Sequence, residues 1–309
     1  MTELPHSPVL LCIGDIDMDI IIRVPSPPGR DQKVDGARVA QTAGGMAANV
    51  AVGASRLGTK TRLLGTVGDD AMGREALAAL RREALDLSHV TNLPGVATFF
   101  CVIMVDDEGE KSLVKAVSPA YLPQPRDVKP AAFDGVAHMH LTFTRHDLAE
   151  RAISLARAAG VSISLDLEAA DLPADGGQVA ELVEQVDLLF VSEQSRKQIE
   201  GRLAPLRAQS NRTIVTTLGS QGARVETADT TTEVDGHSVG VTDTSGAGDA
   251  FAAAYLHAHL GGESAEAALG FANAAAAISI RSYGAQDGLP TRAEVEAFLG
   301  RRAPERSNA

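Results

Sequence analysis

The stretch DTSGAGDAF at residues 243–251 is the most informative segment of this chain. Gly246, Ala247 and Gly248 let the backbone approach a ligand closely and turn successive N–H groups in one direction. The alanine-rich apolar pattern that follows predicts a helix, whose free N–H groups and positive dipole end favour a phosphate at its start. Asp249 stands in the first turn, where we expect the dipole to keep its carboxylate ionised. Such a carboxylate can take the proton of a substrate hydroxyl.

Two other glycine-rich phosphate motifs do not fit this stretch. A Walker loop needs Lys and then Ser or Thr after its last glycine, where Asp249 and Ala250 stand here. A dinucleotide fingerprint needs a third glycine at the position of Phe251, and it belongs near the first strand. A plain helix cap would explain a bare GxGD, but not the whole nine-residue string.

Outward from this stretch, short runs of Val, Ile and Leu alternate with helical patterns. This rhythm predicts an α/β fold with a parallel sheet wrapped by helices. Residues 250–281 are expected to form two alanine-rich helices divided by Gly261 and Gly262. The expected strands are 9–13, 61–66, 136–141, 161–165, 188–191 and 213–217. The expected helices are 46–57, 71–85, 147–159, 178–186 and 193–201.

Two insertions interrupt the alternation. The first contains a strand-like stretch at 33–41, and in the second the runs 99–105 and 111–117 flank the turn 106–109, which predicts a hairpin. We interpret both as one small β-sheet that covers a cleft. The expected division is a main domain of residues 1–15, 44–98 and 118–309, with a β-lid of residues 16–43 and 99–117.

The composition limits the possible partners. The 309 residues include 40 acidic and 28 basic ones, a net charge of −12. Such a field disfavours nucleic acid and anionic membranes, because phosphate backbones need clustered cations. Cys12 and Cys101 lie in apolar runs, which predicts buried thiols and no disulfide framework. Without an export signal or a long apolar run in the sequence, we expect a cytoplasmic protein.

The segment 243–251 resembles DTxGAGDxF, the C-terminal signature of the ribokinase-like (PfkB) carbohydrate kinases. GGMAANVA at 44–51 is similar to the N-terminal signature, and GTVGDDAMG at 65–73 looks like the family segment GxVGxDxxG. The likeness extends in the family's order from Ile13 to about Pro290. It implies a three-layer α/β/α fold with a mostly parallel central sheet and a small β-sheet lid. The activity it implies is phosphorylation of a sugar hydroxyl by ATP with Mg²⁺.

The resemblance assigns roles to particular residues. Asp249 falls on the catalytic base, and Gly246, Ala247 and Gly248 fall on the anion hole for the transferring phosphoryl group. TLGSQG at 217–222 looks like the family turn beside the nucleotide, and its place after an expected strand agrees, since ligands bind at the carboxyl edge of such sheets. The implied ATP-site residues are Thr217, Gly219, Gly222 and Asn273.

The metal site departs from the family pattern. Many relatives have Asn-x-x-Glu where this chain has SEQS at 192–195, so the glutamate that helps to hold the Mg²⁺ water shell is replaced. Glu193 could serve instead, as could Asp166 and Glu168. Asp243, together with 281–288, resembles the loops that bind a monovalent cation (K⁺) in many members. The altered motif also resembles the ketohexokinase and sulfofructose kinase branches.

Substrate candidates lie in other segments. Asp17 and Asp19 follow the first strand on one side of an extended segment, and their carboxylates suit sugar hydroxyls. The alternative for these aspartates is a solvated loop. Family members often carry Asn at the position of Asp17, and Gly45 and Asn49 match positions that contact the sugar.

Three cations suggest a charged substrate. Lys33 and Lys115 lie on the expected lid strands, and Arg145 follows an expected main-sheet strand. Together they would suit a carboxylate, sulfonate or phosphate on the substrate. The alternative is that the lysines are solvated and that Arg145 pairs with a neighbouring acid.

Three functions stay open at this stage. The first is a kinase acting on a furanose or ketose, with an anionic sugar of the sulfofructose, sugar-acid or sugar-phosphate type among the candidates. The second is a nucleoside kinase of the same fold, for which Phe99, Phe100, Phe133 and Phe143 could form the base slot. The third is a non-catalytic sugar or nucleotide sensor. Family members often dimerise through the lid, and we expect a homodimer of this kind.

Overall fold

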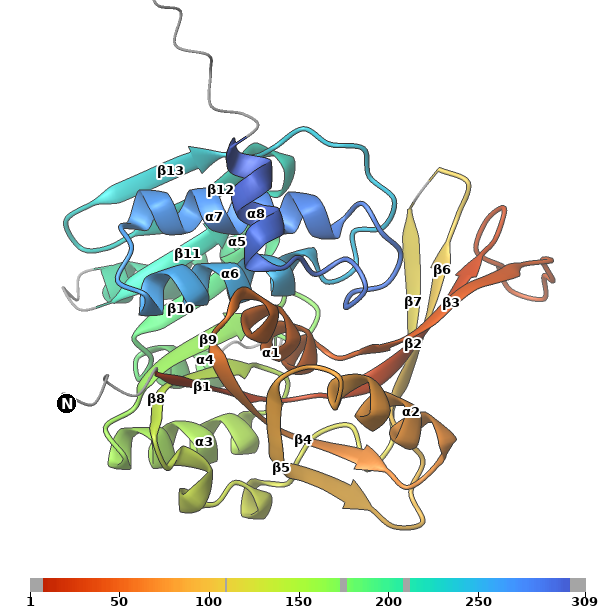
Figure 1. The fold of residues 1–309 in the computed structure, drawn as a ribbon, viewed down its shortest axis with the longest axis horizontal. Coiled ribbons are helices and arrows are strands. Elements are labelled where there is room, and N and C mark those ends of the chain that lie inside the picture. The colour runs from red at the N-terminus through yellow and green to blue at the C-terminus, as the bar shows by residue number, and fades with distance from the viewer. Residues whose placement is uncertain (1–7, 109, 173–176, 208–211, 301–309) are drawn as a thin grey trace, which may run out of the picture.

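The computed structural model describes residues 8–300 except 109, 173–176 and 208–211. Residues 1–7, where we expected no export signal, lie outside the described part. Two sheets organise the rest, one of nine strands and one of four (Figure 1). No helix in the described ranges is both long enough and apolar enough to cross a membrane.

The nine-stranded sheet has the strand order β13-β12-β11-β10-β9-β8-β1-β4-β5. Its strands from β5 to β11 in this order are parallel, and β12 and β13 continue the sheet in antiparallel fashion. The bounds are β1 Val9–Ile13, β4 Lys60–Gly68, β5 Leu85–Leu93, β8 Val136–Thr142, β9 Ser162–Leu167, β10 Leu188–Ser192, β11 Thr213–Thr217, β12 Gly222–Glu226 and β13 Thr231–Asp235.

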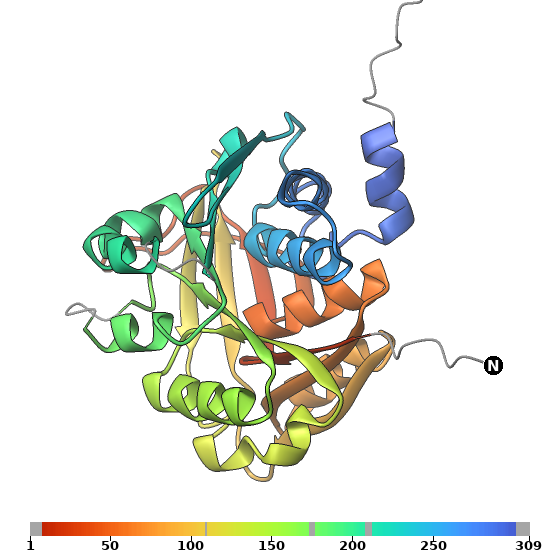
Figure 2. The same cartoon turned by 90° about the vertical axis from the view of Figure 1, so that its left-hand side faces the viewer.

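Helices cover both faces of this sheet, as Figure 2 shows. Side chains alternate along β1, so Leu10 and Cys12 enter the apolar cluster under α1, α6 and α7, while Leu11 and Ile13 enter the cluster under α3, α4 and α5. The expected three-layer α/β/α architecture is therefore confirmed. The helices are α1 Met46–Leu57, α2 Ala71–Leu80, α3 His146–Ala158, α4 Gly177–Val183, α5 Glu193–Arg207, α6 Ala247–Leu260, α7 Ala265–Ser279 and α8 Arg292–Gly300.

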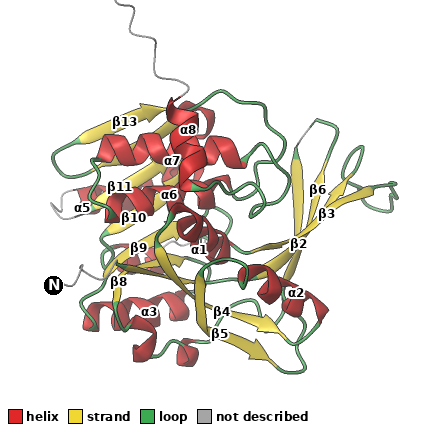
Figure 3. Ribbon diagram, in the orientation of Figure 1, coloured by secondary structure: helices red, strands yellow, loops and turns green. Residues whose placement is uncertain are grey.

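The second sheet stands out from the first (Figure 3). We call it the small sheet, and its strand order is β3-β2-β6-β7, with β3 Ala37–Gly44, β2 Asp17–Arg23, β6 Phe100–Val105 and β7 Lys111–Ala116. Its own apolar cluster is built on Ile21, Phe99, Cys101 and Ile103. Both insertions therefore fold into one separate sheet, as expected.

Several expected bounds are wrong. The strand expected at 33–41 begins only at Ala37, so Lys33 lies in the loop before it. The helix expected to reach Leu85 ends at Leu80, and Leu85 starts the unexpected strand β5. Because β5 is an edge strand, polar residues interrupt its apolar ones, and no apolar run marks it. The edge strand β13 and its neighbour β12 were missed because polar residues also interrupt their apolar ones.

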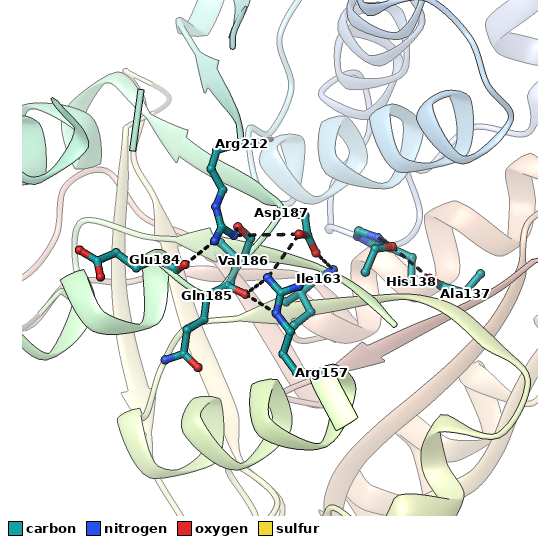
Figure 4. A network of polar contacts seen from close by, with 10 residues as sticks. Ala137, His138, Arg157, Ile163, Glu184, Gln185, Val186, Asp187 and Arg212 are labelled. Atoms are coloured by element: carbon teal, nitrogen blue, oxygen red, sulfur yellow. Dashed lines mark hydrogen bonds and ion pairs between the residues drawn. The ribbon is translucent and has the colours of Figure 1, made fainter. Parts of the chain in front are cut away.

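The amino edge of the large sheet is closed by a polar network around Asp187 (Figure 4). Arg157 donates to the carbonyl oxygen of Gln185 and lies 3.3 Å from Asp187, while Arg212 donates to the carbonyl oxygen of Val186. The two arginines thereby satisfy carbonyl groups just after α4. This network ties helix ends to the amino edge of the sheet. It lies opposite the carboxyl edge, where ligands bind in sheets of this kind.

Candidate active site

The glycine turn before α6 holds Asp249 at the start of that helix. Gly246 is the N-cap residue with φ of 71°, and a Cβ there would lie 2.6 Å from Cβ of Ala285. Only glycine fits both the left-handed backbone and this close approach. A Cβ at Gly248 would meet no atom within 4 Å, so the backbone faces open space there. The backbone at Gly248 is therefore accessible to an anion at the start of α6.

Asp249 is buried and is linked to a second segment through Asn49. The Asn49 side-chain nitrogen donates to an Asp249 carboxylate oxygen at 2.7 Å. Burial raises the pKa of Asp249 well above its ordinary range, and the Asn49 hydrogen bond opposes this rise. The raised pKa runs against the expectation that the helix dipole keeps Asp249 ionised, and burial is its largest cause. A raised pKa suits a group that must accept a proton.

Two adjoining cavities meet at this helix start. The first, of about 370 Å³, is lined by Asp249 together with Asp166, Glu168 and Gln194. The second, of about 550 Å³, is lined by Gly219, Gly222, Asn273 and apolar side chains of the 239–241 loop and α7. The residues that line both are Thr217, Gly248 and Phe251. A ligand with an apolar ring at one end and an anionic chain at the other fits this pair of cavities.

The walls of the second cavity are fixed by backbone contacts. Gly222 has φ of 108°, and a Cβ there would lie 2.1 Å from the carbonyl oxygen of Val234. Asn273 donates to the carbonyl oxygens of Val234 and Asp235 at 3.0 and 3.2 Å. The amide of Asn273 therefore holds the end of β13 against α7, with its side chain at the cavity wall.

Asp17 and Asp19 come together at the start of β2, near Asp249. One Asp17 oxygen lies 3.5 Å from the Cys101 thiol, and the other is buried with no hydrogen-bond partner among the described residues. Burial raises the pKa of Asp17 well above its ordinary range and that of Asp19 to about 7. A Cβ at Gly44 would lie 2.4 and 2.5 Å from oxygens of the two carboxylates. An orphaned carboxylate oxygen beside a bare backbone is suited to accept a ligand hydroxyl.

Gly45 and Asn49 position the neighbouring helix α1. Gly45 is its N-cap residue with φ of 97°, and a Cβ there would lie 2.6 Å from the carbonyl oxygen of Asp15. The side chain of Asp15, which we had not singled out, accepts the Ala47 N–H at 3.2 Å. These contacts hold α1 against the end of β1 and point Asn49 at Asp249.

The three cations expected around a charged substrate do not form one cluster. Lys115 on β7 lies 3.2 Å from Asp171, and Arg145 lies 2.6 Å from Asp147. Lys33 is exposed in the loop between β2 and β3. A cation that we missed, Lys111 on β7, donates to the Ser245 hydroxyl at 3.3 Å. Lys111 and Lys115 are four residues apart on one strand, so the sequence alone could have predicted that they share a face.

The two metal candidates lie apart from the base. Glu193 is exposed, pairs with Lys197 at 3.2 Å and lines a different cavity, on the outer side of α5. Asp243 accepts the N–H groups of Ser245 and Gly284 at 2.9 and 3.0 Å. Asp243 thus joins the glycine turn to the 281–288 loop. By contrast, Asp166 and Glu168 line the first cavity beside Asp249.

Comparison with known proteins agrees with this geometry. The model of the pfkB family of carbohydrate kinases matches residues 8–292. The ATP-dependent ribose-1-phosphate kinase of Halopiger xanaduensis is 31% identical over 295 residues, which cover 95% of this chain and 98% of the relative.

Two solved structures share the fold. Arabidopsis thaliana ribokinase, complexed with ribose and ATP, superposes with a TM-score of 0.79 at 23% identity, over 95% of this chain and 98% of its own. The nucleoside kinase of Methanocaldococcus jannaschii, an archaeal member of the ribokinase family, has a TM-score of 0.79 at 24% identity, over 95% of this chain and 98% of its own.

Proposed function

The chain belongs to the pfkB family of carbohydrate kinases, and from this premise we propose that it transfers the γ-phosphoryl group of ATP to a primary hydroxyl of a ribofuranose. The observation that carries the proposal is the position of Asp249. This buried carboxylate lies at the start of α6, lines the first cavity, lies near Asp17 and accepts a hydrogen bond from Asn49. A base is thereby placed between a nucleotide-sized cavity and a site for hydroxyls.

Each part has a role in the transfer. The adenine lies in the second cavity against Asn273, and the phosphates extend through the first toward Gly248. Asp249 takes the proton of the sugar hydroxyl, and the N–H groups at Gly246–Gly248 stabilise the charge of the transferring phosphoryl group. The small sheet closes over the sugar as a lid and excludes water, which would otherwise accept the phosphoryl group.

Mg²⁺ fits the carboxylates of the first cavity. Burial and the charge of Glu168 raise the pKa of Asp166 to about 7, and burial also raises the pKa of Glu168. Two like charges forced together in a buried wall favour a cation between them. Oxygen ligands and retained waters are what Mg²⁺ prefers beside phosphates, and it would neutralise charge on the ATP oxygens. We assign its water shell to Asp166 and Glu168 rather than to Glu193.

The sugar that we propose first is ribose 1-phosphate. It is the substrate named for the relative from Halopiger xanaduensis, and its phosphate would stand at the far end of the ring from the reacting hydroxyl. Lys115, near Asp171 over the small-sheet side of the site, is the cation best placed to meet that phosphate. Arg145 and Lys33 would take part only after moving from their present positions.

A substrate panel tests this choice. ADP release is measured with ribose, ribose 1-phosphate, fructose, sulfofructose and several nucleosides. Turnover of ribose 1-phosphate above ribose supports an anionic ribofuranose. Preference for a nucleoside would assign the chain to the nucleoside-kinase branch, and no turnover with any acceptor would favour a sensor.

The base assignment has its own test. Asp249→Asn is expected to lower kcat by about 10²–10⁴-fold, because general base catalysis contributes that much. ATP binding measured by calorimetry should change little, since the adenine cavity is untouched. Turnover within about threefold of the wild type would show that another group takes the proton.

Two further assignments follow from the same premise. We expect K⁺ beside the 281–288 loop, which Asp243 orders through the Gly284 N–H, and replacing K⁺ salts by choline salts should lower kcat. We also expect a homodimer through the small sheet, where Leu113, Val114 and Val117 are 51, 54 and 67% exposed. Sedimentation equilibrium measures the mass directly.

A further inference from the structure

A lysine of the small sheet reaches across to the glycine turn. Lys111 is the first residue of β7, and its ammonium lies 3.3 Å from the hydroxyl of Ser245. Ser245 immediately precedes Gly246, and the two partners are 134 positions apart in the sequence. In Figure 1 the same end of β7 lies beside the loops that lead into α6.

The register of the small sheet explains why this lysine and not Lys115 reaches the turn. Lys111 lies opposite Val105, and Lys115 lies opposite Cys101, which itself lies opposite Asp19. Four residues apart, the two lysines share one face of β7 and are separated by about 13 Å along the strand. Lys115 therefore stays over the sugar side, and Lys111 extends to the side of the phosphates.

The charge of Lys111 also acts on the hydroxyl site of β2. Burial raises the pKa of Asp19 to about 7, and Lys111 opposes that rise. Its ammonium thus acts on the hydroxyl site and contacts the glycine turn, in a protein of net charge −12.

The present partner of Lys111 leaves most of its donor capacity for a ligand. An ammonium has three N–H donors, and Ser245 accepts one of them with a neutral hydroxyl. Lys115, by comparison, is already placed against both oxygens of Asp171. A phosphoryl group held by the N–H groups at Gly246 would lie next to Ser245, within the reach of Lys111.

We propose that Lys111 is a further catalytic residue, which donates a hydrogen bond to a non-bridging oxygen of the phosphoryl group during transfer. This inference rests on the proposed kinase function. In the step, the sugar oxygen forms a bond to the γ-phosphorus while the bond from that phosphorus to the ADP oxygen breaks. The hydroxyl proton goes to Asp249, and Lys111 remains protonated throughout. Because Lys111 belongs to the small sheet, its contact is completed only when that sheet covers the sugar.

The test compares Lys111→Met with Lys111→Arg. Loss of one preorganised donor to the transition state costs about 10²–10³ in kcat, so we expect a fall of that size for Lys111→Met. The arginine variant keeps the charge and should recover at least tenfold of the loss. Lys60→Met, at the amino end of β4, makes the same substitution far from the site and should retain wild-type kcat. Ribose or ribose 1-phosphate serves as acceptor, whichever the wild type phosphorylates faster.

Binding measurements separate transition-state contact from ground-state binding. With sugar present, ADP–aluminium fluoride, which imitates the transferring group, should bind Lys111→Met at least tenfold more weakly than the wild type. A non-hydrolysable ATP analogue without sugar should bind both equally. A kcat within threefold of the wild type, or a change confined to the KM of the sugar, would overturn the role of Lys111. A wild type that phosphorylates none of the acceptors would instead overturn the proposed function itself.

Discussion

Asn49→Leu should move the pH dependence of the kinase to higher pH. The Asn49 amide donates to the Asp249 carboxylate at 2.7 Å and holds its pKa below the value that burial alone would give. A hydrogen bond to a charged group is worth about 1.5–3 kcal/mol. Since one pKa unit corresponds to about 1.36 kcal/mol, removing this bond should raise the pKa of Asp249 by about 1–2 units. Leucine keeps the branched shape of asparagine but has no N–H group to donate, so it removes the hydrogen bond to Asp249.

The assay is kcat/KM for the sugar as a function of pH. The base must be deprotonated to act, so activity rises with pH through the pKa of Asp249 in the free enzyme. In Asn49→Leu this rising limb should shift upward by about 1–2 pH units. Asn273→Leu is the matched control, because it removes another buried helix asparagine, bonded to the carbonyls of Val234 and Asp235. It should raise the KM for ATP without moving the limb.

One result would refute this reasoning. If Asn49→Leu lost activity equally at every pH, with the limb unmoved, then Asn49 would act only by contacting the sugar. The limb would then belong to a group other than Asp249. A shift toward lower pH would contradict the sign of the effect, since loss of a donor cannot stabilise the carboxylate.

Three further predictions concern stability and assembly. The pKa of buried His140 is lowered to about 3, so its native form stays neutral while the unfolded chain binds a proton below about pH 6.5. Stability is therefore lost as pH falls through this window. Urea titrations measure the free energy of unfolding, and the wild-type value minus that of His140→Gln should fall by about 1.4 kcal/mol per pH unit between pH 6 and 4. Gly246→Ala should lower the free energy of unfolding by about 1–3 kcal/mol, because its Cβ would meet Ala285 at a φ of 71°, whereas Gly248→Ala should unfold like the wild type. Val114→Glu should lower the mass at sedimentation equilibrium to that of one chain, and an unchanged mass would place any dimer contact elsewhere.

Much of the architecture could be predicted from local pattern. Apolar runs mark the central strands because both faces of a parallel sheet are buried, and β1 and β11 were expected with the bounds that the structure has. The edge strands β5 and β13, and β12 beside β13, were not recognised, because polar residues interrupt their apolar ones. Helix α1 was expected with its observed bounds, since Gly45 and Gly58 flank it.

Only part of the candidate site could be predicted from local sequence pattern. The glycine turn with Asp249 could be recognised because residues adjacent in sequence create it. The Asn49–Asp249 bond joins residues 200 positions apart, and no local pattern carries such a contact. Glu193 was chosen because it lies in the altered SEQS motif, yet it pairs with Lys197 and lines a cavity other than the one that Asp166 and Glu168 line.

The sequence by itself determined the fold class, the phosphate-binding turn and the aspartate beside it, because periodicity and backbone freedom are properties of neighbouring residues. The tertiary structure alone decided the burial of Asp249, which raises its pKa, since burial depends on what packs around the side chain. It also decided which cations face the transfer path. The register of β7 against β6 directs Lys111 to Ser245, while Lys115 and Arg145 lie against carboxylates.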